Sequence, residues 1–158
     1  MRNSIVRGFG SVLRFSGRDT RSQFWPFAGA AIGLYLIASV PVSIILFSNN
    51  VDLTPETPVH FFVTGGLMFL ALVTLLAAAV ARRLHDSGLS GFWGLMPLPF
   101  VIYSATMLLR LDSQFETGGW DMRLFFSIMI SHILYFVTTI WLIALLARRS
   151  ALGPNRFG

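Results

Sequence analysis

Residues 124–147 read LFFSIMISHILYFVTTIWLIALLA, a run of 24 residues without a charged side chain. An α-helix rises about 1.5 Å per residue, so this run extends about 36 Å, enough to cross the hydrocarbon core of a bilayer. Three further uncharged runs, of 23, 23 and 19 residues, occupy residues 25–47, 59–81 and 91–109. The sequence therefore predicts an all-α integral membrane protein, a bundle of four transmembrane helices.

The composition supports this class. Of the 158 residues, 54% are hydrophobic and 12% are charged, whereas about a quarter of the residues in soluble domains are charged. The chain contains no cysteine, which excludes disulfides, thiolate metal sites and cysteine nucleophiles. We predict neither a metal site nor a cofactor.

The charges between the uncharged runs are sorted by sign. All twelve basic residues are arginines, and ten of them lie with two aspartates before the first run, after the second and after the fourth, a net charge of +8. The two remaining loops carry two arginines and five acidic residues, a net charge of −3. Because arginines near span ends are retained in the cytoplasm, both termini and the loop 82–90 are predicted to face inward. Residues 1–24 and 148–158 are then the cytoplasmic ends of a single membrane domain, 1–158.

Anionic lipid headgroups of the membrane are sufficient to explain this excess of positive charge. An arginine beside an anionic lipid surface contributes about 1 kcal/mol to membrane attachment. The arginines are therefore explained without nucleic acid, and we predict no nucleic-acid partner.

Local patterns refine the expected helices. Residues 2–14 have a spacing that suits a short helix on the inner membrane surface, with a flexible basic arm as the alternative. Thr20 and Gln23 have the spacing of a capping box, which predicts the start of the first span. Pro97 and Pro99 remove two backbone donors from the third span, so we expect a break there that faces the bundle interior.

The chain can be read as two copies of one helical hairpin. A Phe-Trp pair precedes the first and third spans, at residues 24–25 and 92–93, and an Arg-Arg pair follows the second and fourth, at 82–83 and 148–149. A duplication would relate the two hairpins by a pseudo-twofold axis. The alternative is that any hairpin anchored from the cytoplasm acquires interfacial aromatics and terminal arginines.

Gly29 and Gly33 lie four residues apart in the first span. Small residues at this spacing let two helix backbones approach closely in lipid. The partner is either another span of the same chain or a second copy in a homo-oligomer.

Three polar strings stand between and beyond the spans. They read GRDTRSQFW at 17–25, RRLHDSGLSGFW at 82–93 and GPNRFG at 153–158. Together they resemble the signatures of the domain-of-unknown-function 805 family, the YhaH-like small bacterial inner-membrane proteins. The resemblance covers nearly the whole chain, and RRLHDSG is its most specific part. It implies a multi-pass protein of the bacterial inner (plasma) membrane with four spans and no assigned activity.

Two features depart from the family pattern. Gln23 stands where the family usually has a glutamate, so an ion pair with an arginine is not implied there, although the capping role is kept. The Pro-Asp-Pro-like ending typical of the family does not follow Gly158 in this sequence, and no function of that ending is implied.

If the three strings meet, their arginines surround smaller polar side chains. Planar guanidinium groups suit a phosphate or a carboxylate because each offers a two-pronged set of donors, and a lipid headgroup is the natural anion at this depth. The predicted anion or headgroup site consists of Arg18, Arg21, Arg82, Arg83, His85, Asp86, Asn155 and Arg156. The alternative is structural: the arginines cap helix ends and pair with the neighbouring aspartates, Asp19 and Asp86.

His132 lies deep inside the fourth predicted span, about 12 Å from its start. With Ser131 and Tyr135 it forms an intramembrane polar stripe, which is a candidate path for a proton or a small solute. The alternative is hydrogen bonding between helices by a neutral histidine.

The sequence favours a non-enzymatic membrane module whose arginine-rich cytoplasmic face binds anionic lipid headgroups or a membrane or cytosolic protein partner. The first alternative is a small transporter or channel subunit that uses His132. The second is an enzyme that acts on a lipid phosphate at His85 and Asp86. We predict no catalytic residue, because adjacent residues in a turn cannot easily orient one side chain onto the other, and the inner face carries only two carboxylates.

Overall fold

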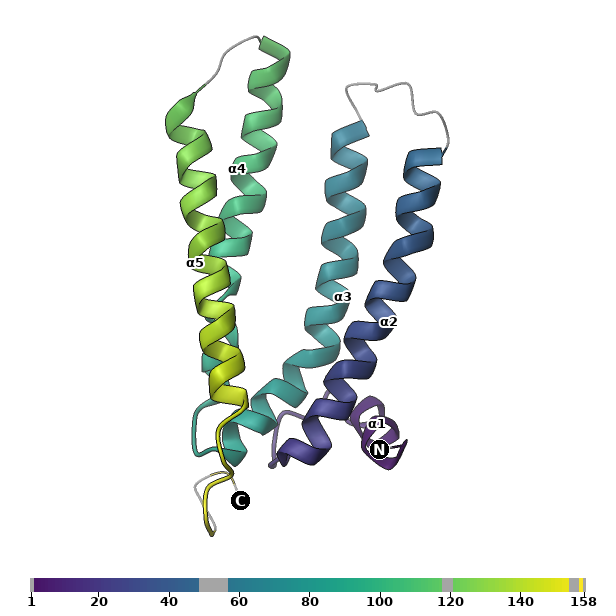
Figure 1. Ribbon diagram of the computed structural model, residues 1–158, viewed down its shortest axis with the longest axis vertical. Helices are drawn as coiled ribbons and strands as arrows, with labels where there is room; N and C mark the ends of the chain where they lie inside the picture. Colours follow the sequence, from purple (N-terminus) through teal and green to yellow (C-terminus); the bar gives the residue numbers. More distant parts are fainter. Residues whose placement is uncertain (1, 49–56, 118–120, 154–156, 158) are drawn as a thin grey trace. The chain divides into compact units, whose positions relative to one another are not determined.

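The computed structural model describes residues 2–48, 57–117, 121–153 and 157. These residues contain no strand and form the elements shown in Figure 1: α1 (Arg2–Gly10), α2 (Arg21–Ser48), α3 (Thr57–Asp86), the 3₁₀-helix η1 (Gly91–Leu95), α4 (Leu98–Thr117) and α5 (Met122–Leu146). The predicted all-α fold is confirmed.

Four helical stretches are long and apolar enough to cross a membrane. They are Arg21–Val42, Val63–Asp86, Gly91–Arg110 and Met122–Leu146. Each overlaps one of the four uncharged runs of the sequence, so the number and approximate position of the spans are confirmed. The chain has the helices of a multi-pass membrane protein.

The chain divides into two compact units. Unit 1 comprises Met1–Gly91 together with Leu146–Gly158, and unit 2 comprises Phe92–Leu145. Unit 1 therefore contains α1, α2, α3 and the segment after α5, whereas unit 2 contains α4 and α5.

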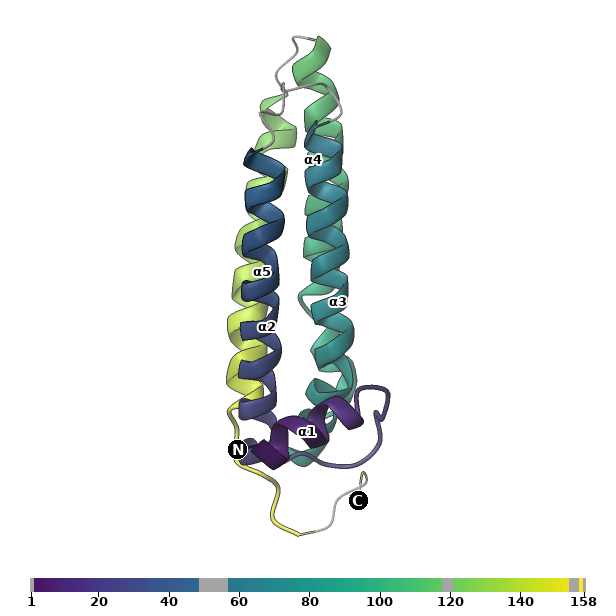
Figure 2. The same cartoon turned by 90° about the vertical axis from the view of Figure 1, so that its right-hand side faces the viewer.

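In unit 1, α1 lies across the beginning of α2, as Figures 1 and 2 show. The rings of Phe9 and Phe27 meet edge to face with their centroids 5.3 Å apart. Gly8 lies against the ring of Phe27, where a Cβ atom would collide with the ring carbons. Residues 2–10 are thus helical, as the first of the two sequence interpretations predicts, and glycine is required where this helix meets α2.

The beginning of α2 partly matches the predicted capping box. α2 begins at Arg21, directly after Thr20, and the Gln23 side chain accepts the Thr20 N–H over 3.1 Å. The Thr20 carbonyl accepts the N–H groups of Gln23 and Phe24 over 3.0 and 2.9 Å, while the Thr20 hydroxyl lies 3.1 Å from the Ser22 hydroxyl. The reach of Gln23 back to the cap is therefore as predicted, whereas the backbone of Thr20 replaces its side chain as acceptor.

The contact between α2 and α3 is built from small residues other than the predicted ones. The buried residues on the two helices include alanines on both sides: Ala28, Ala31, Ala78 and Ala79. A Cβ added at Gly29 or Gly33 would meet nothing within 4 Å. The buried small residues of the two helices are therefore alanines, and the prediction that Gly29 and Gly33 form a contact within the chain is wrong for this unit. Their role in a homo-oligomer stays a prediction.

In unit 2, the two prolines lie at the start of α4 and do not interrupt it. Pro97 directly precedes α4, and Pro99 falls in its first turn, where a missing N–H costs little because no carbonyl lies a turn earlier in the helix. The expected break inside the third span is therefore present, between η1 and α4, although α4 itself is not interrupted. That the break faces the bundle interior stays a prediction. The uncharged run 91–109 forms η1, a turn and then α4, which continues to Thr117.

Candidate functional site

The last turns of α3 carry the polar residues around which unit 1 is organised. α3 ends in a Schellman motif, in which the Leu89 N–H donates to the Leu84 carbonyl and the Gly88 N–H donates to the His85 carbonyl, both over 2.9 Å. Gly88 has a φ of +78°, a conformation that glycine adopts without the strain of a Cβ atom. This helix end fixes the register of the arginines and the aspartate in the preceding turn.

Arg82 binds the N-terminal segment. Its Nε donates to Oδ2 of Asp19 over 2.8 Å, and its Nη atoms donate to the carbonyls of Ser11 and Arg14 and to the Ser11 hydroxyl. The Asp19 N–H donates back to the Arg82 carbonyl over 3.1 Å, and its carboxylate also accepts a hydrogen bond from Arg7. Arg82 and Asp19 are each only 5% exposed, so they form a buried ion pair.

Arg83, the next residue of α3, binds the C-terminal segment instead. Its guanidinium donates from Nε to the Leu146 carbonyl over 2.9 Å, from Nη1 to Oδ2 of Asp86 over 2.7 Å, and from Nη2 to the Arg148 carbonyl. Arg83 is 0% exposed and Asp86 is 2% exposed. A charge buried this completely is tolerated only when it is paired and hydrogen-bonded, and all three nitrogens of this guanidinium have partners.

Asp86 joins the C-terminal segment to the loop before α2. Its Oδ2 accepts from the Ser150 hydroxyl over 2.5 Å, and its carbonyl accepts the Ala151 N–H over 2.8 Å. Its Oδ1 accepts from Nε of Arg18 over 3.3 Å. Arg18 in turn donates to the carbonyls of Ala151 and Gly153 over 3.0 and 2.9 Å. The three polar strings of the sequence therefore meet in unit 1, where Asp86 binds Arg18 and Arg83 and where Arg18 binds the Gly153 carbonyl.

Of the predicted anion-site residues, Arg18, Arg82, Arg83 and Asp86 are brought together. Their donors are directed to carboxylates and carbonyl oxygens of the chain itself, as the structural alternative describes. This arrangement holds the N- and C-terminal segments on α3.

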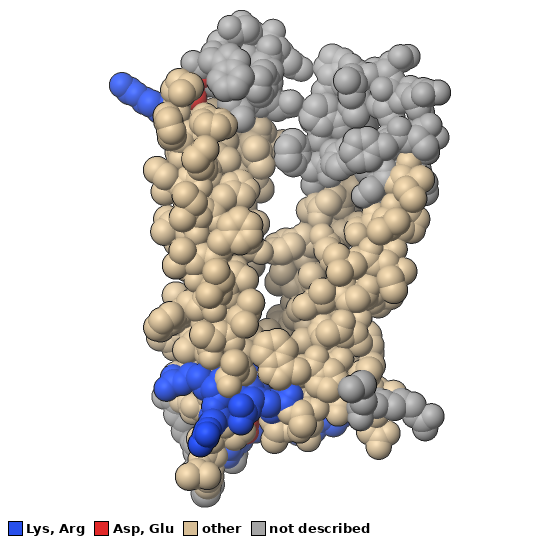
Figure 3. Space-filling view, viewed as in Figure 1, with Lys and Arg blue, Asp and Glu red and all other residues tan. Residues whose placement is uncertain are grey.

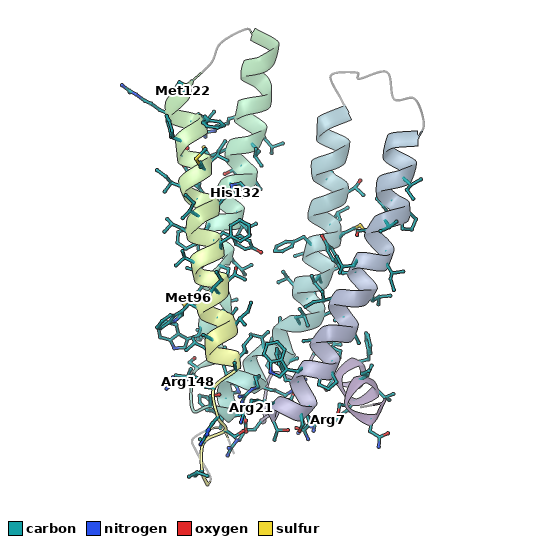
Figure 4. All side chains as sticks on the ribbon, in the orientation of Figure 1. Arg7, Arg21, Met96, Met122, His132 and Arg148 are labelled. Carbon is teal, nitrogen blue, oxygen red and sulfur yellow. The ribbon has the colours of Figure 1, made fainter. Side chains whose placement is uncertain are left out.

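Several arginines with exposed side chains lie around the same end of unit 1. Arg21, at the first residue of α2, and Arg148 and Arg149, just after α5, are exposed. Figure 4 labels Arg7, Arg21 and Arg148 at this end. In Figure 3 the blue of the arginines gathers at the lower end of the view, the middle of the visible helical surface is uncharged, and further blue and red are visible at the upper end.

The other predicted site residues are placed differently. The His85 ring stacks on the Phe157 ring, with centroids 4.0 Å apart and an angle of 8° between the planes. The Asp86 carboxylate lies against Arg18, Arg83 and Ser150, which is not the arrangement of a carboxylate that orients a catalytic histidine. Asn155 and Arg156 lie outside the described residues.

A small polar pocket of about 110 Å³ opens where the N-terminal segment meets α3. It is lined by Arg7, Ser11, Arg14, Ser16, Gly17, Arg18, Asp19 and Arg82. Sequence reasoning named Arg18 and Arg82 but missed Arg7, Ser11 and Arg14. The signal for the missed arginines is their recurrence in the segment before the first span, combined with the glycine turn at Gly17, whose φ is +96°.

The intramembrane polar residues of unit 2 join α4 to α5. The Ser131 hydroxyl donates to the Phe100 carbonyl over 2.8 Å, and Nδ1 of His132 lies 3.1 Å from the Ser104 hydroxyl. The same Nδ1 lies 2.9 Å from the Ile128 carbonyl, and since a carbonyl only accepts, this contact requires a proton on Nδ1. His132 is labelled on α5 in Figure 4. Ser131 and His132 therefore hydrogen-bond between helices.

Tyr135 packs differently from its two polar neighbours. Its ring meets the Phe136 ring with centroids 5.6 Å apart, and its carbonyl accepts from the Thr138 hydroxyl over 3.0 Å. Both contacts lie within α5. Across the described parts of both units, no three histidine, aspartate or glutamate side chains lie together as a metal site would need.

Comparison with known proteins assigns the chain to a family. Neither a curated protein nor a solved structure matches it significantly. A family model described as "Protein of unknown function (DUF805)" matches residues 12–158, which include α2 to α5 and every residue of the two buried ion pairs. The chain belongs to this DUF805 family of proteins of unknown function.

Proposed function

We propose that the protein is a non-enzymatic membrane module whose arginine-rich end binds anionic lipid headgroups. One observation carries this proposal. Asp19 and Asp86, the only acidic residues in the strings at this end, are both buried against arginines of the chain. The exposed arginines Arg21, Arg148 and Arg149 consequently have no acidic side chain to neutralise them there.

The position of these arginines suits a membrane surface. They lie at the first residue of the helix α2 and just beyond the last residue of α5, where apolar spans end. Each arginine at such a boundary contributes about 1 kcal/mol of attraction to anionic headgroups. Attraction between exposed charges is screened by salt, so it weakens as ionic strength rises above physiological.

The sign of the charge also sets the expected orientation. Arginines next to spans are retained on the cytoplasmic side, and this supports both termini and the loop after α3 lying in the cytoplasm. In a bacterium the membrane in question is the inner membrane.

The test is the composition of lipid that remains bound to the purified protein. The full chain is reconstituted into vesicles of equal phosphatidylglycerol and phosphatidylcholine, extracted gently, and its retained lipids are measured by mass spectrometry. We expect enrichment of phosphatidylglycerol, a loss of that enrichment in Arg21→Gln/Arg148→Gln, and no loss in Arg110→Gln/Arg123→Gln, which removes the same charge from the other loops. Equal lipid composition in all three proteins would contradict the proposal.

The alternatives have weaker support. For a transporter, the polar residues of α5 would need to line a path, whereas Ser131 and His132 use hydrogen-bonding atoms on α4 and α5. For an enzyme at His85 and Asp86, the carboxylate would need to orient the ring, whereas it lies against Arg18, Arg83 and Ser150. Binding of a protein partner at the same exposed arginines is the nearest competing role.

A further inference from the structure

We propose that the pocket between the N-terminal segment and α3 is a discrete site for one phosphate group, with Arg14 and Arg7 as its ligand-binding residues. The inference rests on the proposed function and gives it a defined site and ligand class. It differs from diffuse attraction by the exposed arginines because it predicts one bound phosphate for each chain.

The charge of the lining favours an anion. Four arginines and one aspartate surround the pocket: Arg7, Arg14, Arg18, Arg82 and Asp19. The aspartate is already engaged by two of the arginines. The lining therefore keeps a positive excess in a partly enclosed site, where electrostatic attraction is stronger than in open water.

The free donors identify the residues that would touch the ligand. Arg82 and Arg18 direct Nε and both Nη atoms to the chain itself. The Arg14 guanidinium, in contrast, donates to no residue that the structure describes, and its side chain is exposed. Arg7 uses Nη2 for Asp19 and Gln23 and has two further nitrogens. Arg14 and Arg7 thus offer the charge-assisted, two-pronged donors that a phosphate accepts.

The size of the pocket limits the ligand. A water molecule in the liquid occupies about 30 Å³, so a pocket of about 110 Å³ has room for three to four waters. This space accommodates a phosphate group. The rest of a lipid headgroup would extend outside it.

The paired state of the aspartates predicts selectivity among phosphates. A zwitterionic headgroup carries an ammonium or quaternary amine that is best stabilised by a carboxylate. Asp19 is committed to Arg7 and Arg82, and Asp86 to Arg18 and Arg83. The site consequently favours phosphates without an attached cation, such as phosphatidylglycerol, over phosphatidylcholine.

The experiment compares two matched single substitutions in the full chain. Arg14→Gln and Arg149→Gln each remove one exposed arginine from the same end of unit 1, and neither side chain has a hydrogen-bond partner among the described residues, so both variants are expected to fold. Short-chain phosphatidylglycerol is titrated into each detergent-solubilised protein, and bound lipid is counted by native mass spectrometry. Because hydrogen bonds to charged groups are stronger than those between neutral groups, we expect Arg14→Gln to bind at least about tenfold more weakly than Arg149→Gln. Arg14→Lys should recover part of the loss.

A second arm identifies the source of the phosphate. Inorganic phosphate is added in competition with the lipid. Displacement of the lipid at low millimolar phosphate would assign the site to a soluble phosphate, whereas persistence of one bound lipid would assign it to a headgroup. Either result supports the proposed site only if Arg14→Gln binds the lipid more weakly than Arg149→Gln.

Equal affinity of Arg14→Gln and Arg149→Gln for phosphatidylglycerol would overturn the proposal that the pocket binds a phosphate group. If phosphatidylglycerol were still enriched in the vesicle experiment, the proposed function would stand and only the discrete site would fail. Absence of phosphatidylglycerol enrichment in the unmodified protein would instead remove the proposed function itself.

Discussion

Arg82 and Asp19, 63 positions apart in the chain, are joined in both directions: the guanidinium donates to the carboxylate over 2.8 Å, and the Asp19 N–H donates to the Arg82 carbonyl over 3.1 Å. The pair ties the segment before α2 to the end of α3. The neighbouring Arg83 makes the corresponding connection to the segment after α5. Two consecutive arginines of one helix thus hold the two terminal segments of the chain.

Removing one member of the Arg82–Asp19 pair is expected to destabilise the protein strongly. In Asp19→Ala the Arg82 guanidinium keeps its buried position without its counter-charge, and breaking a buried pair in this way costs about 3–5 kcal/mol. The measurement is the free energy of unfolding in a denaturing detergent titration. The control is Arg14→Gln, whose guanidinium has no described hydrogen-bond partner. A cost for Asp19→Ala as small as that of the control would show that the pair does not hold the fold.

Loss of Arg83 is expected to release the C-terminal segment selectively. Arg83→Gln removes the hydrogen bonds to the Leu146 and Arg148 carbonyls and leaves Asp86 without its closest counter-charge. Amide hydrogen exchange over residues 148–153 should accelerate at least about tenfold, because a loss of 1.4 kcal/mol changes an opening equilibrium tenfold. Arg149→Gln should leave this exchange unchanged. Unaltered protection of Ala151 in Arg83→Gln would be incompatible with the proposed connection.

Gly8 and Gly10 provide a matched test of the contact between α1 and α2. A Cβ at Gly8 would collide with the ring of Phe27, which is 1% exposed and cannot swing into solvent, whereas a Cβ at Gly10 meets nothing within 4 Å. We expect Gly8→Ala to cost about 1–3 kcal/mol of stability through overpacking. Gly10→Ala should be neutral or stabilising by up to about 1 kcal/mol, since alanine is the better helix former. Thermal unfolding of both variants measures the difference, and equal melting temperatures would contradict the packing of α1.

Substitution of His132 distinguishes a role in hydrogen bonding between helices from a role in transport. If its hydrogen bond to Ser104 serves packing, Ser104→Ala and His132→Leu should each cost about 0.6 kcal/mol, the average for such bonds in membranes. Neither should change proton or solute flux into liposomes that contain the protein. A flux present in the unmodified protein and lost in His132→Leu would instead support the transporter alternative.

The sequence predicts the spans well because each depends on a property of many residues. A run of more than twenty uncharged residues has no stable alternative to a membrane-crossing helix, so α2, α3 and α5 lie where expected. The ends are less predictable. α3 continues through Arg82 and Arg83 because Asp19 and Asp86 neutralise their charge and backbone carbonyls accept their remaining hydrogen bonds. All of these partners except Asp86 come from distant parts of the chain. Pro97 and Pro99 move the start of α4 because a helix tolerates proline in its first turn.

The candidate site was predictable in some of its members but not in its contacts. The polar strings placed Arg18, Arg82, Arg83 and Asp86 at one end of the molecule, and the structure brings them together. No local pattern indicates that Arg82 turns to the N-terminal segment while Arg83 turns to the C-terminal one. Because Arg18 and Arg82 direct their donors to the chain, the guanidinium of the pocket lining that has no described partner belongs to Arg14, which periodicity alone could only assign to a helix or an arm.

The sidedness of the arginine-rich end is tested most directly by thiol labelling, which the absence of cysteine makes simple. Leu152→Cys and Asp121→Cys each place one thiol at an exposed position, after α5 and before α5 respectively. A membrane-impermeant maleimide is added to cells with a permeabilised outer membrane and an intact inner membrane. The account predicts labelling at position 121 and protection at position 152 until the inner membrane is lysed. Labelling at position 152 with protection at position 121 would place the arginines outside and contradict the account.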